Sequence, residues 1–363
     1  MAHFNVSVVP VTIEPHHNAD ALEVARVGGY RSVVRKGAFR TGDLVAYIPE
    51  QSLVPAPILE ELGLVGRLAG RDANRVKAIR LRGVLSQGIC YPARPGWVVG
   101  QDVAEVLGIV KYEPPVPTAM SGVVYAAGLD RTLRYDIENI KRYPDVFVAG
   151  EPVVFTEKIH GTWAQLGWMS TATAHPEHGR LVVASKGFAS KGLAFVPDAV
   201  DNQHNLYLRV ARMLDIGARI TDALPAAIAA GPVFVLGEVF GQGVQDLGYG
   251  AKASHDASLG FRAFDVYVGL PGQGRYLSDA ELEQALMAMG IARVPVVYRG
   301  PFSENALNAH TRGPETVSGE GLHLREGVVV RPTIERTVDA LGRAQLKSVS
   351  EDYLLRKGGT EFN

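Results

Sequence analysis

Short β-type runs separated by turn residues are the feature that most restricts how this chain can fold. Within the first hundred or so residues such runs occur at Phe4–Val11, Ala21–Val27, Ser32–Val34, Leu44–Ile48 and Val76–Ile79. Many short strands with Gly and Pro between them are typical of a small β-barrel. We therefore predict a small barrel in this part of the chain.

A proline-rich stretch follows the predicted barrel. Pro114, Pro115 and Pro117 stiffen residues 112–122 and exclude a helix interior there. We place a domain boundary in this stretch and expect a short helix at Asp136–Arg142, ending before Pro144. The predicted parts are a barrel domain at 1–115, a linker with a connecting helix at 116–145 and a second domain at 146–363.

From Pro152 onward, β-type runs alternate with helical segments. Apolar residues at helical spacing predict a helix at Asn205–Leu214. A second helix is expected at Ser278–Met289, because Ser278 and Glu281 form a capping box and Gly290 follows its end. These features predict an α+β second domain, with strands at Val153–Thr156, Leu181–Ser185, Val233–Glu238, Arg262–Val268, Gly327–Arg331 and Ala344–Val349.

The composition is that of an ordinary water-soluble globular chain, with 47% hydrophobic and 21% charged residues. No apolar run reaches the ~20 residues needed to span a bilayer, so we expect no contact with membranes. Residues 1–10 lack the basic patch and apolar core of a secretory signal. The single cysteine, Cys90, excludes an internal disulfide framework and a cysteine-based zinc site. We expect a cytoplasmic monomer.

The net charge of -1 gives no global sign of nucleic-acid binding. Basic residues nevertheless cluster locally, and a local basic surface is what attracts a phosphate backbone. The cluster consists of Arg71, Arg75, Lys77, Arg80 and Arg82. A solvated surface with counter-charges nearby explains the cluster equally well.

Lys158 is the first candidate for chemistry. It follows a β-type run and precedes Gly161, which predicts a strand that ends in a tight turn where a ligand can approach the backbone. A lysine nucleophile must lose its proton although its ordinary pKa is ~10.4, and neighbouring cations or desolvation can lower that pKa. A bare Lys-x-x-Gly is weak support, since the chain has 40 glycines.

The wider segment is more specific. Residues 157–162 read EKIHGT and closely resemble the nucleotidyl-transfer motif of ATP-dependent RNA ligases, whose superfamily also contains DNA ligases and mRNA-capping guanylyltransferases. The resemblance implies that Lys158 attacks the α-phosphate of a nucleotide and that Glu157 and Gly161 lie against the nucleotide. It also implies that His160 assists the later steps. A structural histidine that bonds the backbone is the alternative.

Further motifs of the superfamily follow in its usual order. Ser185-Lys186-Gly187 resembles the motif whose basic residue, here Lys186, contacts the nucleotide or its phosphates. The Gly237-Glu238 pair resembles the motif whose glutamate, here Glu238, accepts a hydrogen bond from the ribose. The run 261–267 resembles the motif whose aromatic ring, here Phe264, stacks on the adenine. A surface turn, a strand-end carboxylate and a core aromatic are the respective alternatives.

The last two motifs lie near the carboxyl-terminal end. The run REGVVVR at 325–331 implies that Glu326 helps to hold Mg²⁺ and that Val328 or Val330 covers the other face of the adenine. The run QLKS at 345–348 implies that Lys347 contacts the α-phosphate and stabilises its negative charge. Some relatives carry a second lysine here, where this chain has Gln345 or Val349.

The order of the domains narrows the resemblance. Residues 16–24 resemble the entry of OB-type tRNA-binding modules, and the ligase-like region follows them. An OB-like domain before the catalytic domain, with none recognised after it, resembles the Deinococcus-type, or fifth, RNA ligase family, as does the run 350–356. The resemblance implies a catalytic domain of antiparallel sheets with flanking helices, which uses ATP with Mg²⁺, for which Mn²⁺ can substitute.

The same resemblance implies the substrate: a 3′-OH RNA end at a nick in a duplex that the amino-terminal domain grips. Two alternatives stay open, a capping-type guanylyltransferase that uses GTP and a non-catalytic RNA-binding protein. We discount a metal site at His175 and His178, because both lie in a predicted loop and no second cluster of ligands is evident.

Overall fold

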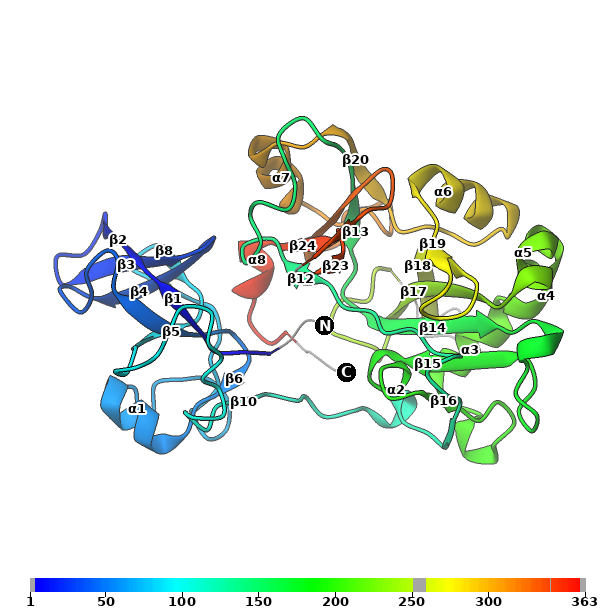
Figure 1. Cartoon of the computed structure of the whole chain (residues 1–363), viewed down its shortest axis with the longest axis horizontal. Coiled ribbons are helices and arrows are strands. Elements are labelled where there is room, and N and C mark those ends of the chain that lie inside the picture. The colour runs from blue at the N-terminus through cyan, green and yellow to red at the C-terminus, as the bar shows by residue number, and fades with distance from the viewer. Residues whose placement is uncertain (1–3, 251–258, 340, 360–363) are drawn as a thin grey trace. The chain divides into compact units, whose positions relative to one another are not determined.

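The computed structural model describes residues 4–250, 259–339 and 341–359. The chain divides into two compact units (Figure 1). The amino-terminal unit comprises 2–113 together with 139–145, and the larger unit comprises 114–138 together with 146–363. The domain limits at 115 and 145 that we read from the sequence stay predictions.

Short antiparallel strands build the amino-terminal unit, as the sequence predicts. One sheet has the order β1-β5-β9 and another the order β2-β3-β4, with small pairs β7–β8 and β6–β10. Their bounds are β1 Ser7–Pro10, β2 Thr12–Pro15, β3 Leu22–Val27, β4 Tyr30–Arg35, β5 Leu44–Ile48, β6 Ser52–Leu53, β7 Ile79–Leu81, β8 Val84–Ser86, β9 Ile89–Pro92 and β10 Val110–Lys111, with helix α1 at Ala56–Leu62.

Two predictions for the first 145 residues are wrong. The run Val76–Ile79 is not a strand, because the backbone of Val76 bonds Ser52 and Gln51 in irregular structure and the strand begins only at Ile79. The run Asp136–Arg142 is not a helix, because its residues bond elsewhere. The carbonyl of Lys141 accepts a hydrogen bond from Gly29 at 2.7 Å, and such tertiary contacts override a weak helical preference.

Two five-stranded sheets form the larger unit. The β13 sheet has the order β12-β24-β21-β13-β20, and the β17 sheet has the order β15-β14-β17-β18-β19. β13 pairs antiparallel with β20 and β21, and all neighbours in the β17 sheet are antiparallel. The bounds are β12 Glu138–Asn139, β13 Pro152–Lys158, β14 Thr162–Trp168, β15 Leu181–Ser185, β17 Val233–Gly241, β18 Leu259–Val268, β19 Arg275–Tyr276, β20 Val296–Pro301, β21 Gly327–Pro332 and β24 Leu346–Val349.

Helices cover one face of the β17 sheet (Figure 1). Buried residues of α3, α4, α5 and α6 pack there against Leu166, Val235 and Val266 of the sheet. Both predicted helices are confirmed: the Asn205 side chain caps α3 at 3.1 Å, and Glu281 accepts a 2.9 Å hydrogen bond from Ser278 at the start of α6. The helices are α2 Lys186–Ala189, α3 Leu206–Met213, α4 Ile216–Ala223, α5 Pro225–Ala230, α6 Asp279–Ala288, α7 Glu304–Thr311 and α8 Glu351–Leu354, and the remaining strands are β11 Val124–Ala126, β16 Leu193–Phe195, β22 Thr337–Val338 and β23 Gly342–Arg343.

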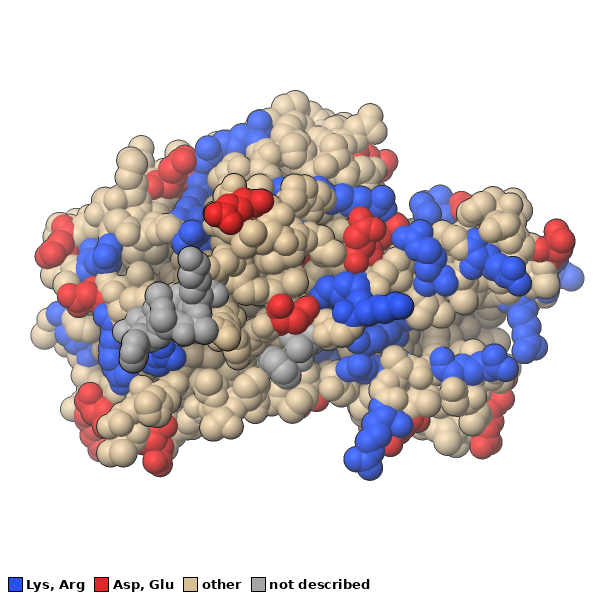
Figure 2. Space-filling model, turned by 180° about the vertical axis from the view of Figure 1, so that it is seen from behind, with Lys and Arg blue, Asp and Glu red and all other residues tan. Residues whose placement is uncertain are grey.

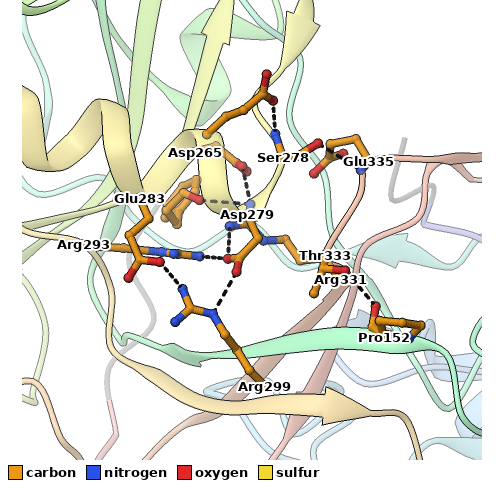
Figure 3. A network of polar contacts seen from close by, with 12 residues as sticks. Pro152, Asp265, Ser278, Asp279, Glu283, Arg293, Arg299, Arg331, Thr333 and Glu335 are labelled. Atoms are coloured by element: carbon orange, nitrogen blue, oxygen red, sulfur yellow. Dashed lines mark hydrogen bonds and ion pairs between the residues drawn. The ribbon is translucent and has the colours of Figure 1, made fainter.

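A buried ionic network joins the two sheets (Figure 3). Arg331 of β21 donates to Asp265 of β18 at 2.7 Å, and both side chains are almost fully buried. Burial alone would raise the pKa of Asp265, but Arg343 and Arg331 outweigh it and hold that pKa below its ordinary value. Asp279, at the start of α6, extends the network to Arg299 at 2.8 Å. The network fixes the two sheets against each other.

In the described part of the chain no helix is long and apolar enough to cross a bilayer.

Candidate active site

Lys158 is the last residue of β13, and its side chain is about a quarter exposed. Its Nζ lies 2.6 Å from Oε1 of Glu326, whose side chain is only 8% exposed. The strand register explains the pair, because Lys158 lies opposite Gly327, the residue after Glu326. The first predicted pair of site residues therefore meets at the shared end of β13 and β21.

Strand alternation adds Lys347 to the same face. Val329 of β21 lies opposite both Thr156 of β13 and Lys347 of β24, and Thr156 is two residues from Lys158. Side chains two residues apart point to one face of a sheet. The pKa of Lys347 is lowered to about 8, first by burial and then by the charges of Lys158 and Lys186. Lys347 is therefore a desolvated cation in the field of Lys158.

The same alternation corrects the prediction for Val328. Val328 lies opposite Glu157, on the other face of the sheet from Lys158, and it has no exposed surface. Val330 is on that face as well and is equally buried. Val329 is the valine that shares the face of Lys158. The two-residue period separates Val328 from Val329, but only the pairing of β21 with β13 and β24 shows which of them faces Lys158.

Glu157 also points away from Lys158. Its Oε2 accepts a 2.8 Å hydrogen bond from the backbone of Thr316, and Arg325 lies 3.6 Å away. Burial raises the pKa of Glu157 against the lowering effect of these neighbours. The carboxylate is thus bound within the protein, and a contact between Glu157 and a nucleotide stays a prediction.

Glu238 and Gly161 bring the β17 sheet to the site. A Cβ on Gly161 would lie 2.2 Å from the carbonyl oxygen of Val239 and 2.9 Å from Cγ of Glu238, so only glycine allows this approach of β17. The pKa of Glu238 is raised to about 8 by burial, while Lys158 lowers it and Glu326 raises it further. Glu238 therefore lies beside Gly161, in the turn that follows Lys158, although its strand belongs to the other sheet.

Phe264 and Lys186 lie at the edges of this group. Phe264 occupies a bulge in β18, is half-buried and packs with its ring centroid 5.3 Å from that of Tyr135. Lys186 is about half exposed, and its Nζ lies 3.1 Å from Asp136. Adenine stacking by Phe264 and phosphate contact by Lys186 stay predictions.

His160 lies in the turn that connects the two sheets and is nearly fully buried. Its Nε2 is 2.7 Å from Asp246, its Nδ1 is 2.7 Å from the hydroxyl of Tyr353, and its backbone N–H donates to Tyr249 at 2.6 Å. Burial lowers the pKa of His160, against the raising effect of Glu326. No spacing in the sequence pointed to Asp246 or Tyr249 as partners.

A model of the RNA ligase family matches residues 151–349, more than half of the chain. The chain belongs to the RNA ligase family. An OB-fold domain model matches residues 6–93. The predicted α+β fold, an OB-type barrel followed by an adenylation-type domain of antiparallel sheets, is therefore confirmed. Membership makes the chain an RNA ligase enzyme.

Solved structures of Naegleria gruberi RNA ligase share this fold. One mutant with ATP and Mn has a TM-score of 0.77 at 22% identity, and another with AMP and Mn has a TM-score of 0.76 at 21% identity. Each comparison covers 96% of this chain and 97% of the other. An apo mutant has a TM-score of 0.75 at 22% identity, with 97% and 98% covered. No curated protein matches the sequence.

The described residues of this RNA ligase contain no group of three or more His, Cys, Asp or Glu that could hold a metal ion. Glu326 still fits a metal-binding role, because its buried Oε2 has no hydrogen-bond partner and lies 4.0 Å from Nδ1 of His160. Mg²⁺ commonly binds one or two carboxylates, with substrate phosphates and water completing its ligands. A single carboxylate therefore suits a metal that arrives with the nucleotide.

The position expected for a second lysine is part of the ionic network. Gln345 is buried and donates to the hydroxyl of Tyr135 at 2.7 Å, and Tyr135 in turn bonds Asp265. Lysine there would place a cation inside this hydrogen-bonded core. The charges of Lys158 and Lys186 both contribute to the lowered pKa of Lys347.

Proposed function

We propose that this chain is an ATP-dependent RNA ligase that forms a lysyl-AMP on Lys158. The observation that carries the proposal is the position of Lys158 in the RNA ligase domain, 2.6 Å from Glu326 and on one sheet face with Lys347. ATP and AMP accompany Mn in structures of the Naegleria ligase, which supports ATP as the nucleotide. Mg²⁺ is the proposed metal, with Mn²⁺ as its substitute.

In the first step, Nζ of Lys158 attacks the α-phosphate of ATP. The new phosphorus–nitrogen bond replaces the bond to the β-phosphate oxygen, and pyrophosphate leaves. Lys347 stabilises the negative charge that grows on the α-phosphate, and Glu238 accepts from the ribose. Glu326 would hold the metal ion, which supplies charge neutralisation of the phosphates when it is bound. Phe264 and Val329 would enclose the adenine.

In the second step, AMP passes from Lys158 to a 5′-phosphate end and makes a 5′-5′ pyrophosphate. In the third step a 3′-hydroxyl attacks that end and releases AMP. His160, two residues from Lys158, assists one of these steps. The exposed residues of the basic cluster, Arg71, Lys77, Arg80 and Arg82, bind the phosphate backbone of the RNA.

We further propose the Deinococcus-type branch and its substrate, a nick with a 3′-OH RNA end in a duplex. The order of the two matched regions, 6–93 before 151–349, supports the branch. The proposal includes a monomeric protein in the cytoplasm.

Incubation with Mg²⁺ and α-labelled ATP or GTP tests the first step. The expected result is label from ATP that stays on the denatured protein and is absent from a Lys158→Ala variant. Label from GTP alone would favour a capping-type enzyme. No label from either nucleotide would favour a non-catalytic RNA-binding protein and would contradict the proposal.

A second assay tests the substrate. Nicked duplexes that end in 3′-ribose or 3′-deoxyribose are compared under single-turnover conditions. We expect faster sealing of the ribose end. Equal rates would contradict the preference for RNA ends while leaving the ligase proposal intact.

A further inference from the structure

Both ring nitrogens of His160 have hydrogen-bond partners, and the partners fix the orientation of the ring. Nε2 lies 2.7 Å from Oδ1 of Asp246 and 3.2 Å from Nη2 of Arg356, so a carboxylate and a guanidinium both contact it. Nδ1 lies 2.7 Å from the hydroxyl of Tyr353, which can donate or accept. Rotation of the ring would break the contacts at both nitrogens. The three partners therefore select one ring orientation.

Arg356 holds Asp246 and Tyr353 in place. Its Nε lies 3.1 Å from Oδ2 of Asp246 and its Nη2 lies 3.2 Å from Oδ1, which is a two-point contact with the carboxylate. Its guanidinium carbon lies 3.7 Å from the ring centroid of Tyr353, and its Nη1 donates to the carbonyl of Tyr353. Asp246 and Tyr353 come from distant parts of the chain, and Arg356 connects them.

The segment that carries Tyr353 is fastened to the catalytic strands. It directly follows β24, the strand of Lys347, and the N–H of Ser350 donates to the backbone oxygen of Glu326 at 2.8 Å. Glu351 forms an ion pair with Arg312 at 2.8 Å. Helix α8 is therefore held at its start, and its single turn directs Tyr353 to His160.

The orientation of His160 matters for Glu326, the carboxylate that pairs with Lys158. Its buried Oε2 has no hydrogen-bond partner and is 4.0 Å from Nδ1 of His160. If Tyr353 did not occupy Nδ1, the ring could turn toward Glu326 and donate from Nδ1 to Oε2. His160 would then compete for the carboxylate that pairs with Lys158.

We propose that Asp246, Tyr353 and Arg356 are positioning residues that fix the orientation of the His160 ring. The inference rests on the proposed function, because the step that His160 serves is a step of the ligase reaction. None of the three residues needs to touch the substrate. Their effect reaches the reaction through the position of the His160 ring.

A double-mutant cycle tests this inference on the full chain. Rates of lysyl-AMP formation from ATP and of sealing of a pre-adenylated nick are measured separately, and the step that His160→Ala slows is identified. Tyr353→Phe and Asp246→Asn are expected to slow that same step about 10- to 100-fold, the usual effect of losing a residue that orients a histidine. Added to His160→Ala, each should change the rate by less than about twofold.

Additive effects would overturn the inference, and so would wild-type rates in Tyr353→Phe or in His160→Ala. Tyr298→Phe is the matched control, since the Tyr298 hydroxyl donates to the carbonyl of Pro301, three residues along its own strand. Arg356→Lys keeps the charge but loses the two-point contact, so it should slow the same step. This variant provides the test if Tyr353→Phe unfolds the protein. Absence of any lysyl-AMP in the wild type would instead refute the proposed function, so the two failures are distinguishable.

Discussion

At the scale of single residues, strand register decides which side chains can act together. Lys158, Val329 and Lys347 share one face of the β13 sheet, while Glu157 and Val328 occupy the other. Motif resemblance alone does not separate neighbours such as Val328 and Val329, because both are apolar and both lie in the same run. The two-residue period of the strand separates them.

The two valines should respond differently to truncation. Val329→Ala is expected to raise the ATP concentration needed for half-maximal lysyl-AMP formation several-fold, because Val329 faces the proposed adenine site. Val328→Ala should leave that concentration unchanged and lower the free energy of unfolding by about 2 kcal/mol, the order expected for a fully buried aliphatic side chain. Denaturant unfolding and ATP titration measure the two effects. The reverse pattern would contradict the assignment.

The lowered pKa of Lys347 predicts a pH dependence of lysyl-AMP formation. Its pKa of about 8 means that it is charged below pH 8 and loses its proton above it, whereas an unperturbed lysine stays charged to about pH 10. At limiting ATP, the contribution of Lys347 to lysyl-AMP formation should therefore fall as the pH rises through about 8. A Lys347→Arg variant keeps its charge and should shift this fall to higher pH. Identical profiles for the wild type and the arginine variant would contradict this role.

At the scale of elements, the contact between the two sheets depends on buried charges. Asp265 of β18 accepts from Arg331 of β21 and from Arg343, so the sheets that carry Glu238 and Lys158 are tied by ion pairs as well as by packing. Removing one partner of such a pair leaves an uncompensated charge in the core.

Asp265→Asn should lower the free energy of unfolding by roughly 3–5 kcal/mol. Arg275→Gln is the control in the same unit, because its ion pair with Glu281 is exposed and should cost less than about 1 kcal/mol. The pKa of Asp265 is lowered, so its contribution is present above the ordinary value of 3.8 and is lost as the pH falls through the lowered value. Denaturant unfolding at pH 7 and in acid measures both. Equal losses in the two variants would contradict a role for the buried pair.

Local sequence signals predicted many elements and few of the contacts between them. The run Leu44–Ile48 and the capped helix α6 carry their own patterns, β-type residues in one and a capping box in the other. The helix expected at Asp136–Arg142 failed because bonds to distant residues, such as that between Gly29 and Lys141, decide its conformation.

In the candidate site, too, the sequence predicted single residues but not their distant contacts. The motifs supplied Lys158, Glu326 and Lys347, and the register brings them to one end of the β13 sheet. The partners of His160 and the pair of Arg331 with Asp265 are contacts over long sequence separations. No local period encodes such contacts, so only the folded structure identifies them.

At the scale of the whole molecule, two units divide the proposed work. Figure 2 shows Lys and Arg side chains distributed over the face in view, interspersed with Asp and Glu side chains. In the amino-terminal unit, Arg71, Lys77, Arg80 and Arg82 are exposed, whereas Arg75 lies over the ring of Tyr112. These four exposed side chains can bind a phosphate backbone. Arg75 is less accessible, because its guanidinium packs on Tyr112.

Reversing two of these charges should separate RNA sealing from nucleotide chemistry. An Arg80→Glu, Arg82→Glu double variant is expected to lower sealing at limiting RNA about tenfold or more and to weaken its salt dependence, because phosphate contacts are lost. Lysyl-AMP formation without RNA should be unchanged. Arg275→Gln, a charge change in the other unit, is the control. Unchanged sealing would remove this surface from the RNA site.

The central claim is that Lys158 becomes covalently joined to AMP. The most direct measurement is mass spectrometry of peptides from protein incubated with ATP and Mg²⁺. We expect one peptide with the mass of an added AMP, and fragmentation that places the AMP on Lys158. An AMP on Lys186 or Lys347, or no adduct on any peptide while the protein seals RNA, would contradict it.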